Sequence, residues 1–461
     1  MEKNSKDVEA LLGDPKKSIL YMSIPLFFSF LIGTLQNFID GIWCSGLGPD
    51  QLSAISIAGP AYQIIMSVGM AMGVGATASI ARAIGAGDKN KADRLVSQAV
   101  VVTIIASFFV MIIMYFCTEP LITISGGGYN VDITMEYMRP YLICALPLVS
   151  YGLMTGLLRA EGAAKKSTAV SITASILNMI LDPIMIYVLD LGVAGAAWAT
   201  CISFILALFL GISFYARGKT YLTPPFKGFR FDPVLLKEIG VVAIPYAIEI
   251  VLMALMVAPE QYLVTTCGGS DGLVIYVNAF KYAALVMIPA SAIGAALIPV
   301  VSAQIGQGDP KKVNSSIFYS AKIIFLIEAF LGLILFIFAD QLINLYTYSE
   351  EMAPLHDEMV LALRIYSIVP ITNGMMRIGI SVLQALRKAV VSSALSFLRE
   401  IFFLSFYWIA SKISMEAIYW SLDLTNVLAM IIILAVAFHY LKKTMGGSNN
   451  TAGREQTEPE N

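Results

Sequence analysis

The segment Ile84–Lys91, IGAGDKNK, recurs 221 positions later as Ile305–Lys312, IGQGDPKK. Each copy directly follows a long apolar stretch. The dipeptide Ile24–Pro25 likewise recurs as Ile244–Pro245, at a separation of 220 positions. A repeat whose period is close to half of the 461-residue chain indicates that one structural unit occurs twice. We expect the two octapeptides to form equivalent corners that fix loop geometry in each half rather than bind a ligand.

The composition places both units in a lipid bilayer. Apolar residues make up 57% of the chain and charged residues only 13%, and the mean hydropathy is +0.76. A helix needs about 20 apolar residues to cross about 30 Å of hydrocarbon, and we find twelve such runs. Because the runs are continuous rather than alternating, they indicate helices and not a β-barrel. The fold class is therefore all-α integral membrane, with twelve transmembrane helices in two six-helix lobes.

The same composition argues against several other classes of protein. Lys and Arg nearly balance Asp and Glu, at 30 against 32, so nothing suggests a nucleic-acid partner. Five cysteines are scattered along the chain, which indicates neither a disulfide framework nor a metal cluster. The sequence has no HExxH, Walker A or DDxxD motif, and we expect no enzymatic activity. No filter-like segment of a channel is present either.

Polar segments set the boundaries of the lobes. The stretch 217–236 is the one substantial polar connection between long apolar blocks, and its three prolines argue against a continuous helix. We predict a cytoplasmic N-terminal segment (1–17), an N-lobe (18–216), a cytoplasmic linker (217–236), a C-lobe (237–443) and a disordered cytoplasmic tail (444–461). With six spans each, the lobes share one orientation and are related by an axis along the membrane normal.

Lys and Arg in the short connections predict the orientation in the membrane. They gather in alternate connections, at positions 82–94, 159–166, 217–237, 311–312, 387–388 and 442–443. The intervening loops contain little more than Arg139 and Lys412. Because positively charged loops stay in the cytoplasm, we expect a multi-pass protein of the cell membrane with both termini in the cytoplasm.

Ionisable residues inside the spans are the first candidates for chemistry, because a charge in hydrocarbon is costly. Asp40 lies near the outer end of the first span, and Asp182 lies in the fifth. Asn178 shares the helical face of Asp182, and Pro183 leaves the Met179 carbonyl without its helical donor. Two carboxylates, an amide and a free carbonyl suit a proton or a sodium ion. The alternative is structural, with Asp40 at the membrane interface and Asp182 capping a bend.

The second half has a weaker candidate. Glu260 occupies the position equivalent to Asp40 and directly follows Pro259. We take Glu260 as the best cation ligand of this half, with Lys281 as its partner or as a counter-ion. Most other charges in these spans are expected to pair within the bundle.

Five segments together match a known family in their order along the chain. They are Asp40–Trp43, Arg82–Asp88, Leu158–Gly162, Asn178–Pro183 and Gly192–Thr200. From about residue 14 to residue 443, the chain resembles the multidrug and toxic compound extrusion (MATE) transporters, most closely their DinF-like branch. The resemblance implies a V-shaped pair of lobes that exports amphiphilic, often cationic compounds in exchange for protons or sodium ions. It also implies a monomer with no cofactor besides the coupling ion.

The resemblance assigns roles to individual residues as well. It implies an N-lobe site for a proton or a sodium ion formed by Asp40, Asn178, Asp182 and Thr200. It also implies that the first span bends at Pro25. The chain departs from the family at Gln36, where a tyrosine is frequent, and at Gly152 and Thr155, where asparagines are frequent. Gln36 and Thr155 are therefore secondary candidates in a polar network that is thinner than usual.

Relatives that resemble NorM bind cations in the C-lobe, through acidic residues of the seventh and tenth spans. Glu260 matches the first of these acids, but no acid lies between Leu361 and Ala385 to match the second. We therefore favour coupling through the N-lobe. The choice between proton and sodium stays open.

The expected mechanism follows from the paired acids. Two carboxyl groups in a low-dielectric pocket do not both ionise without a cation. Ion binding would change the bend of the first span and reshape a substrate pocket between the lobes, lined by aromatic and methionine side chains. The alternative function is a flippase of the same superfamily for a lipid-linked saccharide or other lipid, which would need a large basic cavity.

Overall fold

The computed structural model describes residues 6–123, 131–348 and 352–452, with side chains as far as residue 445. The described residues form helices and connecting turns, with no strand among them. A short helix, α1 (Lys6–Leu12), comes first. The N-lobe contains α2 (Pro15–Ser45), α3 (Pro49–Gly85), α4 (Lys89–Ile122), α5 (Val131–Ile143), α6 (Ala145–Ala160), α7 (Ala164–Pro183), the π-helix η2 (Ile184–Val188) and α8 (Gly192–Ala216).

The C-lobe follows the linker. It contains α9 (Pro233–Val286), α10 (Ile288–Gly306), α11 (Pro310–Ile337), α12 (Ala339–Asn344), η3 (Ala353–Leu355), α13 (His356–Tyr366), α14 (Val369–Ala385), α15 (Ala389–Ala410) and α16 (Met415–Ala452). The linker thus lies between the end of α8 and the start of α9. Because α16 continues to Ala452, its helix includes the first part of the segment 444–461 that the sequence predicts to be disordered. Residues 453–461 lie outside the described residues.

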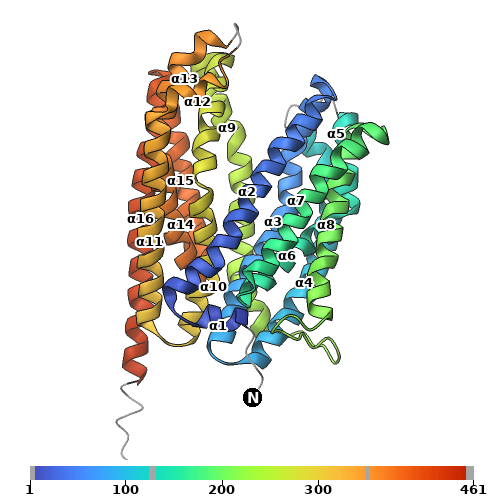
Figure 1. The fold of residues 1–461 in the computed structure, drawn as a ribbon, viewed down its shortest axis with the longest axis vertical. Helices are drawn as coiled ribbons and strands as arrows, with labels where there is room; N and C mark the ends of the chain where they lie inside the picture. Colours follow the sequence, from blue (N-terminus) through green and yellow to red (C-terminus); the bar gives the residue numbers. More distant parts are fainter. Residues whose placement is uncertain (1–5, 124–130, 349–351, 453–461) are drawn as a thin grey trace, which may run out of the picture.

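Membrane-spanning helices make up most of the described chain. Eleven helices are long and apolar enough to cross a membrane, and α5 and α6, which meet at an angle of 59°, bring the number to twelve. Gly269 has a φ of +64°, which breaks the long helix α9 into two parts. The second part continues as α10 towards the opposite end of the lobe (Figure 1). These findings confirm the predicted all-α membrane fold.

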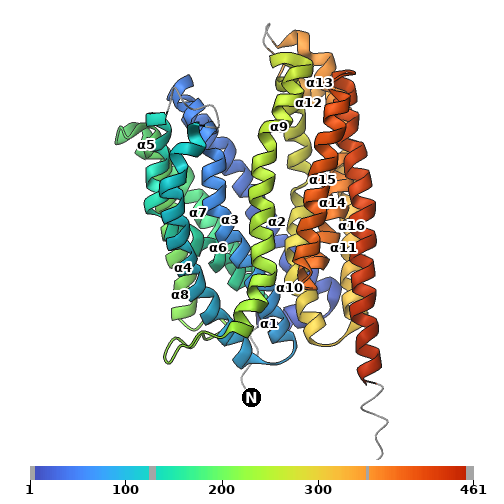
Figure 2. The ribbon, with the colours of Figure 1, turned by 180° about the vertical axis from the view of Figure 1, so that it is seen from behind.

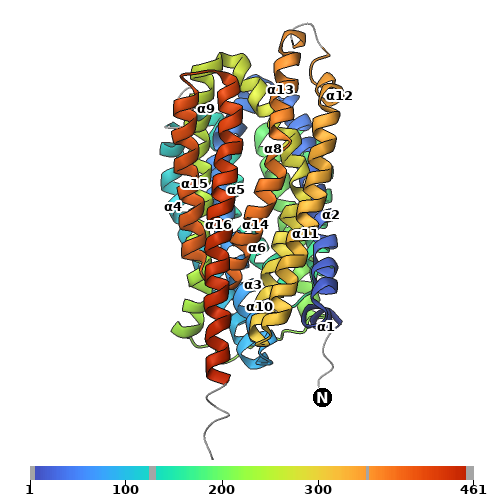
Figure 3. The same cartoon turned by 90° about the vertical axis from the view of Figure 1, so that its left-hand side faces the viewer.

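The two lobes are joined at one end and diverge towards the other. The N-lobe and the C-lobe form separate bundles at the end away from α1, whereas their helices meet around α1 (Figures 1 and 2). We call these the splayed end and the joined end. α11, α15 and α16 lie on the outer side of the C-lobe (Figure 3).

The first helix of each lobe begins beside the other lobe. α2 packs on α10 and α11 of the C-lobe and on α7 of the N-lobe. α9 does the converse, since it packs on α3 and α4 of the N-lobe and on α13 and α15 of the C-lobe. A change of bend in either helix therefore alters how one lobe sits against the other.

The repeated octapeptides form equivalent corners. Gly87 and Gly308 have φ values of +75° and +70° and end the preceding turn, a conformation that favours glycine. Asp88 then caps α4 by accepting from the Lys91 N–H at 2.9 Å, and Asp309 caps α11. In each octapeptide a glycine ends one helix and an aspartate caps the next, which explains why the same residues recur in both.

Candidate functional site

Asp40 and Asp182 face each other where α2 packs on α7. Asp40 lies in the last two turns of α2, and Asp182 lies in the last turn of α7 and is 1% exposed. Their carboxyl groups are close enough to interact electrostatically. Pro183 ends α7, and the π-helix η2 follows directly. A π-turn leaves the regular backbone ladder altered beside the carboxylate, as often occurs at functional sites.

A chain of hydrogen bonds joins the remaining predicted residues to this pair. Gln36 Nε2 donates to Asp40 Oδ2 at 3.3 Å and also to Asn178 Oδ1. Asn178 Nδ2 donates to Asp182 Oδ1 at 3.0 Å and to Thr200 Oγ1 at 3.4 Å. The structure thus brings together Asp40, Asn178, Asp182 and Thr200, the four residues named from the resemblance. Gln36, a secondary candidate, is the link between α2 and α7.

One acceptor in this network has no donor. Asp40 Oδ1 is buried and has no hydrogen-bond partner among the described residues. The amides of Gln36 and Asn178 are committed to the contacts already named, and a carboxylate cannot donate. A buried acceptor without a donor is unfavourable. A proton on one of the two carboxyl groups, or a small cation between them, would satisfy it.

Gly152 and Thr155, where the resemblance implies asparagines, lie in the close packing of α6. A Cβ atom on Gly152 would lie 2.5 Å from the Gly69 carbonyl carbon of α3, which leaves no room for an asparagine. The hydroxyl of Thr155 donates to the Gly152 carbonyl at 2.9 Å within its own helix. Thr155 therefore makes a local hydrogen bond, and Gln36 supplies the amide on the α2 side.

The hinge residue Pro25 lies inside α2, which continues on both sides of it. Proline has no N–H to donate to the carbonyl one turn earlier. Met22 and Leu26 beside it are buried among C-lobe side chains of α10 and α11. The weakened turn of α2 thus lies against the C-lobe, while Asp40 lies against the N-lobe.

The C-lobe contains a half-buried acid, Glu260, and a buried one, Asp423. Tyr276 donates to Glu260 Oε1, and Tyr407 donates to the Tyr276 hydroxyl at 3.0 Å. Asp423 of α16 is 4% exposed, and neither of its carboxylate oxygens has a hydrogen-bond partner in the described part of the chain. Tyr366 lies within electrostatic range of both acids. Sequence reasoning missed Asp423, although a lone carboxylate inside the last apolar run is the signal that identified Asp182.

Lys281 is not the partner of Glu260 among the described contacts. Its Nζ donates to Asn278 Oδ1 at 2.9 Å and lies 5.8 Å from the centre of the Tyr346 ring. The described residues also contain no group of three or more His, Cys, Asp or Glu side chains placed to hold a metal ion. Glu260 instead accepts from the hydroxyl of Tyr276.

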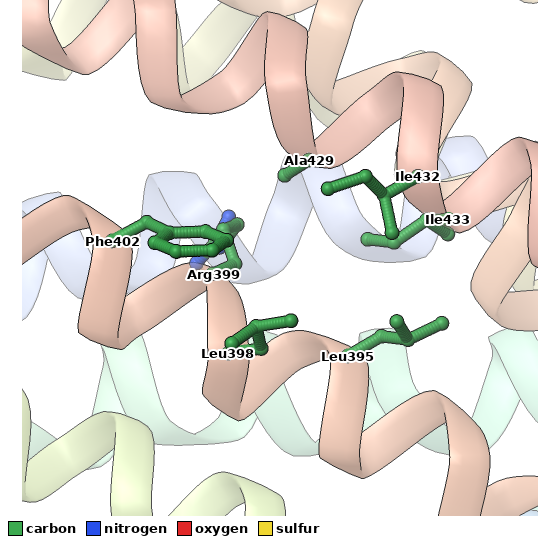
Figure 4. Close-up of a pocket in the computed structure, with 7 residues that line it drawn as sticks. All are labelled: Leu395, Leu398, Arg399, Phe402, Ala429, Ile432 and Ile433. Atoms are coloured by element: carbon green, nitrogen blue, oxygen red, sulfur yellow. The ribbon is translucent and has the colours of Figure 1, made fainter.

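An apolar pocket lies between α15 and α16 (Figure 4). It is lined by Leu395, Leu398, Arg399, Phe402, Ala429, Ile432 and Ile433. Its cavity volume of about 10 Å³ has room for about one water molecule. It is too small to hold a drug-sized compound.

Comparisons with known proteins agree with the sequence resemblance. A family model described as MatE matches residues 25–184 and 245–409. The multidrug export protein MepA of Staphylococcus aureus (strain NCTC 8325 / PS 47) is 29% identical over 243 residues, which cover 51% of this chain and 53% of MepA. This chain therefore spans about half the length of that relative.

Two further comparisons cover more of the chain. The FAD transporter of Shewanella oneidensis (strain MR-1) is 24% identical over 363 residues, which cover 75% of this chain and 78% of that protein. A crystal structure of a MATE in complex with MaL6 matches with a TM-score of 0.92 and 28% identity. That match covers 95% of this chain and 99% of the solved chain.

Proposed function

This chain belongs to the MatE family, whose members are transporters and not enzymes, and we propose that it exports amphiphilic, often cationic compounds in exchange for protons or sodium ions. The names of its relatives support export of small molecules: MepA is a multidrug export protein, and a second relative is an FAD transporter. The repeat architecture suits this activity, since two similar lobes can move about a site between them.

The observation that carries the proposal is the linkage of Asp40 to Asp182 through Gln36 and Asn178, together with the buried Asp40 Oδ1, which has no hydrogen-bond partner among the described residues. Like charges so close in a low-dielectric setting cannot both be present without a cation. The empty protein therefore takes up an ion at this point, and release of that ion changes the contact between α2 and α7. Because α2 also packs on the C-lobe, this change is transmitted to the relative position of the lobes.

A proton suits the site better than sodium. Sodium would need several oxygen ligands at once. Asn178 Oδ1 already accepts from Gln36, and Thr200 Oγ1 already accepts from Asn178 and donates to the Ala196 carbonyl at 3.1 Å. A proton shared by the carboxyl groups satisfies Asp40 Oδ1 without breaking any of these hydrogen bonds. Sodium is the alternative coupling ion at the same site.

Location and orientation complete the proposal. The protein lies in the cell membrane as a monomer, with the joined end and both termini in the cytoplasm. Basic residues at the joined end support this orientation: Lys166 and Lys312 contact α1, and Lys91 and Arg387 pair with Glu238 near the start of α9. The splayed end then faces outward, and substrate leaves between the lobes.

Transport by proteoliposomes tests the proposal. Vesicles with an acidic lumen should accumulate the amphiphilic cation ethidium, and Asp40→Asn and Asp182→Asn should abolish this accumulation. Asp190→Asn is the matched control, because Asp190 is exposed and asparagine tolerates its φ of +53°. Normal ethidium uptake by Asp40→Asn at equal insertion would refute coupling through this site.

The same vesicles distinguish the alternatives. Uptake driven by an outward sodium gradient at equal pH, and not by a proton gradient, would identify sodium as the coupling ion. Movement of a labelled phospholipid between leaflets, without a gradient and without ethidium uptake, would favour the flippase.

A further inference from the structure

The two copies of the repeated segment lie against each other at the joined end. A Cβ atom on Gly85 would lie 1.9 Å from the Ala303 carbonyl oxygen, and one on Gly306 would lie 2.1 Å from the Arg82 carbonyl oxygen. Gly306 follows Gly85 by 221 positions, and Ala303 follows Arg82 by the same 221. The contact between α3 and α10 is therefore symmetric, and only glycine permits so close an approach of the two backbones.

An acid at the start of α9 binds cations from both lobes. Glu238 Oε1 lies 2.8 Å from Lys91 Nζ of the N-lobe, and Glu238 Oε2 lies 2.7 Å from Arg387 Nη2 of the C-lobe. Lys91 belongs to the first octapeptide, and Arg387 follows α14. We call this set of three residues the α9 clasp. It ties the start of the C-lobe to a corner of the N-lobe.

The helix α1, like the start of α9, contacts cations of both lobes. Asp7 Oδ2 lies 2.6 Å from Lys166 Nζ of the N-lobe, and the Leu12 carbonyl accepts from Lys312 Nζ of the C-lobe at 3.0 Å. We call these four residues the α1 clasp. Each clasp thus uses a segment before or at the start of the first span of one lobe to hold a lysine from the corner of the other lobe.

The cations of the two clasps are repeat equivalents. Lys312 follows Lys91 by 221 positions, and Arg387 follows Lys166 by 221 positions. The same separation relates Gly85 to Gly306, so three pairs of residues at this end obey one symmetry, whereas the acceptors of the two clasps, Glu238 in one and Asp7 with the Leu12 carbonyl in the other, are not repeat equivalents. This agreement is not required by local corner geometry, which the capping aspartates already explain. It shows that the octapeptides also form an interface between the lobes, beyond the role the sequence suggests for them.

We propose that the Gly85–Gly306 contact and the two clasps are the cytoplasmic gate of the transport cycle, closed in this structure and opened when substrate enters from the cytoplasm. This inference rests on the proposed function. Its parts suit a contact that must break and re-form. Partly exposed ion pairs are individually weak, and a contact between glycine and backbone has no interlocked side chains to withdraw. Once open, the gate would expose the buried cluster of Ala78, Val242, Ile298 and Ala389, which lies between the same helices.

Labelling of a buried cysteine tests whether this contact opens. Ala78 is 0% exposed, so an Ala78→Cys reporter should react with a polar maleimide only when the gate opens. The protein is placed in lipid nanodiscs, where the reagent reaches both faces and orientation does not matter. Each variant is also prepared without the added cysteine, to subtract labelling of the five native cysteines.

Adding one methyl group to the contact should favour the open gate. Gly85→Ala and Gly306→Ala force a Cβ atom into a carbonyl oxygen, and the labelling rate should rise at least about tenfold in each. Gly59→Ala is the matched control, because Gly59 lies on the same helix, α3, and has no atom within 4 Å of the added Cβ. Its labelling rate should stay at the wild-type value.

Two further variants keep the test decisive if the added methyl groups prevent folding. Glu238→Gln and Asp7→Asn add no volume and weaken one clasp each, and both should raise the labelling rate. Unchanged labelling in every variant that keeps a wild-type melting temperature would overturn the proposal and make the contact a permanent scaffold. Because the assay contains no substrate and no ion gradient, its outcome stands even if the protein does not export ethidium.

Discussion

Replacing Glu161 by glutamine tests how the linker is held against the N-lobe. Glu161 follows α6 and is 1% exposed. Its Oε2 accepts from the backbone N–H groups of Tyr221 at 2.9 Å and Leu222 at 3.1 Å, while Oε1 is buried with no partner in the described part of the chain. Burial raises the pKa of this carboxyl from 4.5 to about 7, although the two N–H groups and Lys166 act in the opposite direction.

Linkage gives the sign and the size of the effect. The folded carboxyl keeps its proton up to about pH 7, whereas the unfolded carboxyl loses it near pH 4.5. The Glu161 carboxyl therefore contributes most to the free energy of unfolding below pH 4.5, and this contribution declines as the pH rises to about 7. At 1.36 kcal/mol per pKa unit, Glu161 should lower the free energy of unfolding by about 2.5 kcal/mol between pH 5 and pH 8.

Unfolding of the detergent-solubilised protein at several pH values measures this effect. Glu161→Gln keeps an acceptor for both N–H groups but does not titrate. We expect it to be more stable than the wild type by about 2.5 kcal/mol at pH 8 and nearly equal to it at pH 5. Glu9→Gln is the matched control, because Glu9 is exposed. If Glu161→Gln and the wild type lose stability in parallel as the pH rises, the reasoning is wrong.

Three further substitutions probe the site and the helices that hold it. Asn178→Leu removes the amide that binds Asp182, so thermal unfolding should show a loss of about 2 to 4 kcal/mol; an unchanged free energy of unfolding would contradict the network. Gly152→Asn places its Cβ 2.5 Å from the Gly69 carbonyl carbon, and unfolding should show a loss of about 1 to 3 kcal/mol, whereas a stable variant would mean that α3 and α6 separate easily. Pro25→Ala should leave the melting temperature unchanged or higher and slow proton-driven ethidium exchange about tenfold; wild-type exchange would rule out the hinge.

Much of the fold could be predicted because it depends on local properties of the chain. A run of apolar residues long enough to span the bilayer identifies each helix, and the recurring octapeptide reveals the duplication. The helix α1 was not predicted, since seven residues are too few for an independent helix. It is held in place by Lys166 and Lys312, which are distant in the sequence. Contacts between residues that are distant in the sequence leave no pattern in the local sequence from which the helix could be predicted.

The residues of the candidate site could also be predicted in part from the sequence. The spacing of Asn178 and Asp182 places both on one face of a helix. Asp40 was grouped with them because it is an ionisable residue in a span, and the family resemblance implied the same site, but no local pattern in the sequence places Asp40 beside Asp182. The bridging role of Gln36 depends on how α2 packs against α7. Asp423 could have been found from the sequence, since it is a lone carboxylate in an apolar run.

Proton release on substrate binding tests the central claim most directly. The purified protein in weakly buffered detergent, at a pH where the site is protonated, is mixed with ethidium while a pH-sensitive dye records free protons. The wild type should release about one proton for each ethidium bound, and Asp40→Asn and Asp182→Asn should bind ethidium without releasing a proton. Ethidium binding to the wild type without proton release, or equal release by both variants, would contradict coupling through the Asp40–Asp182 pair.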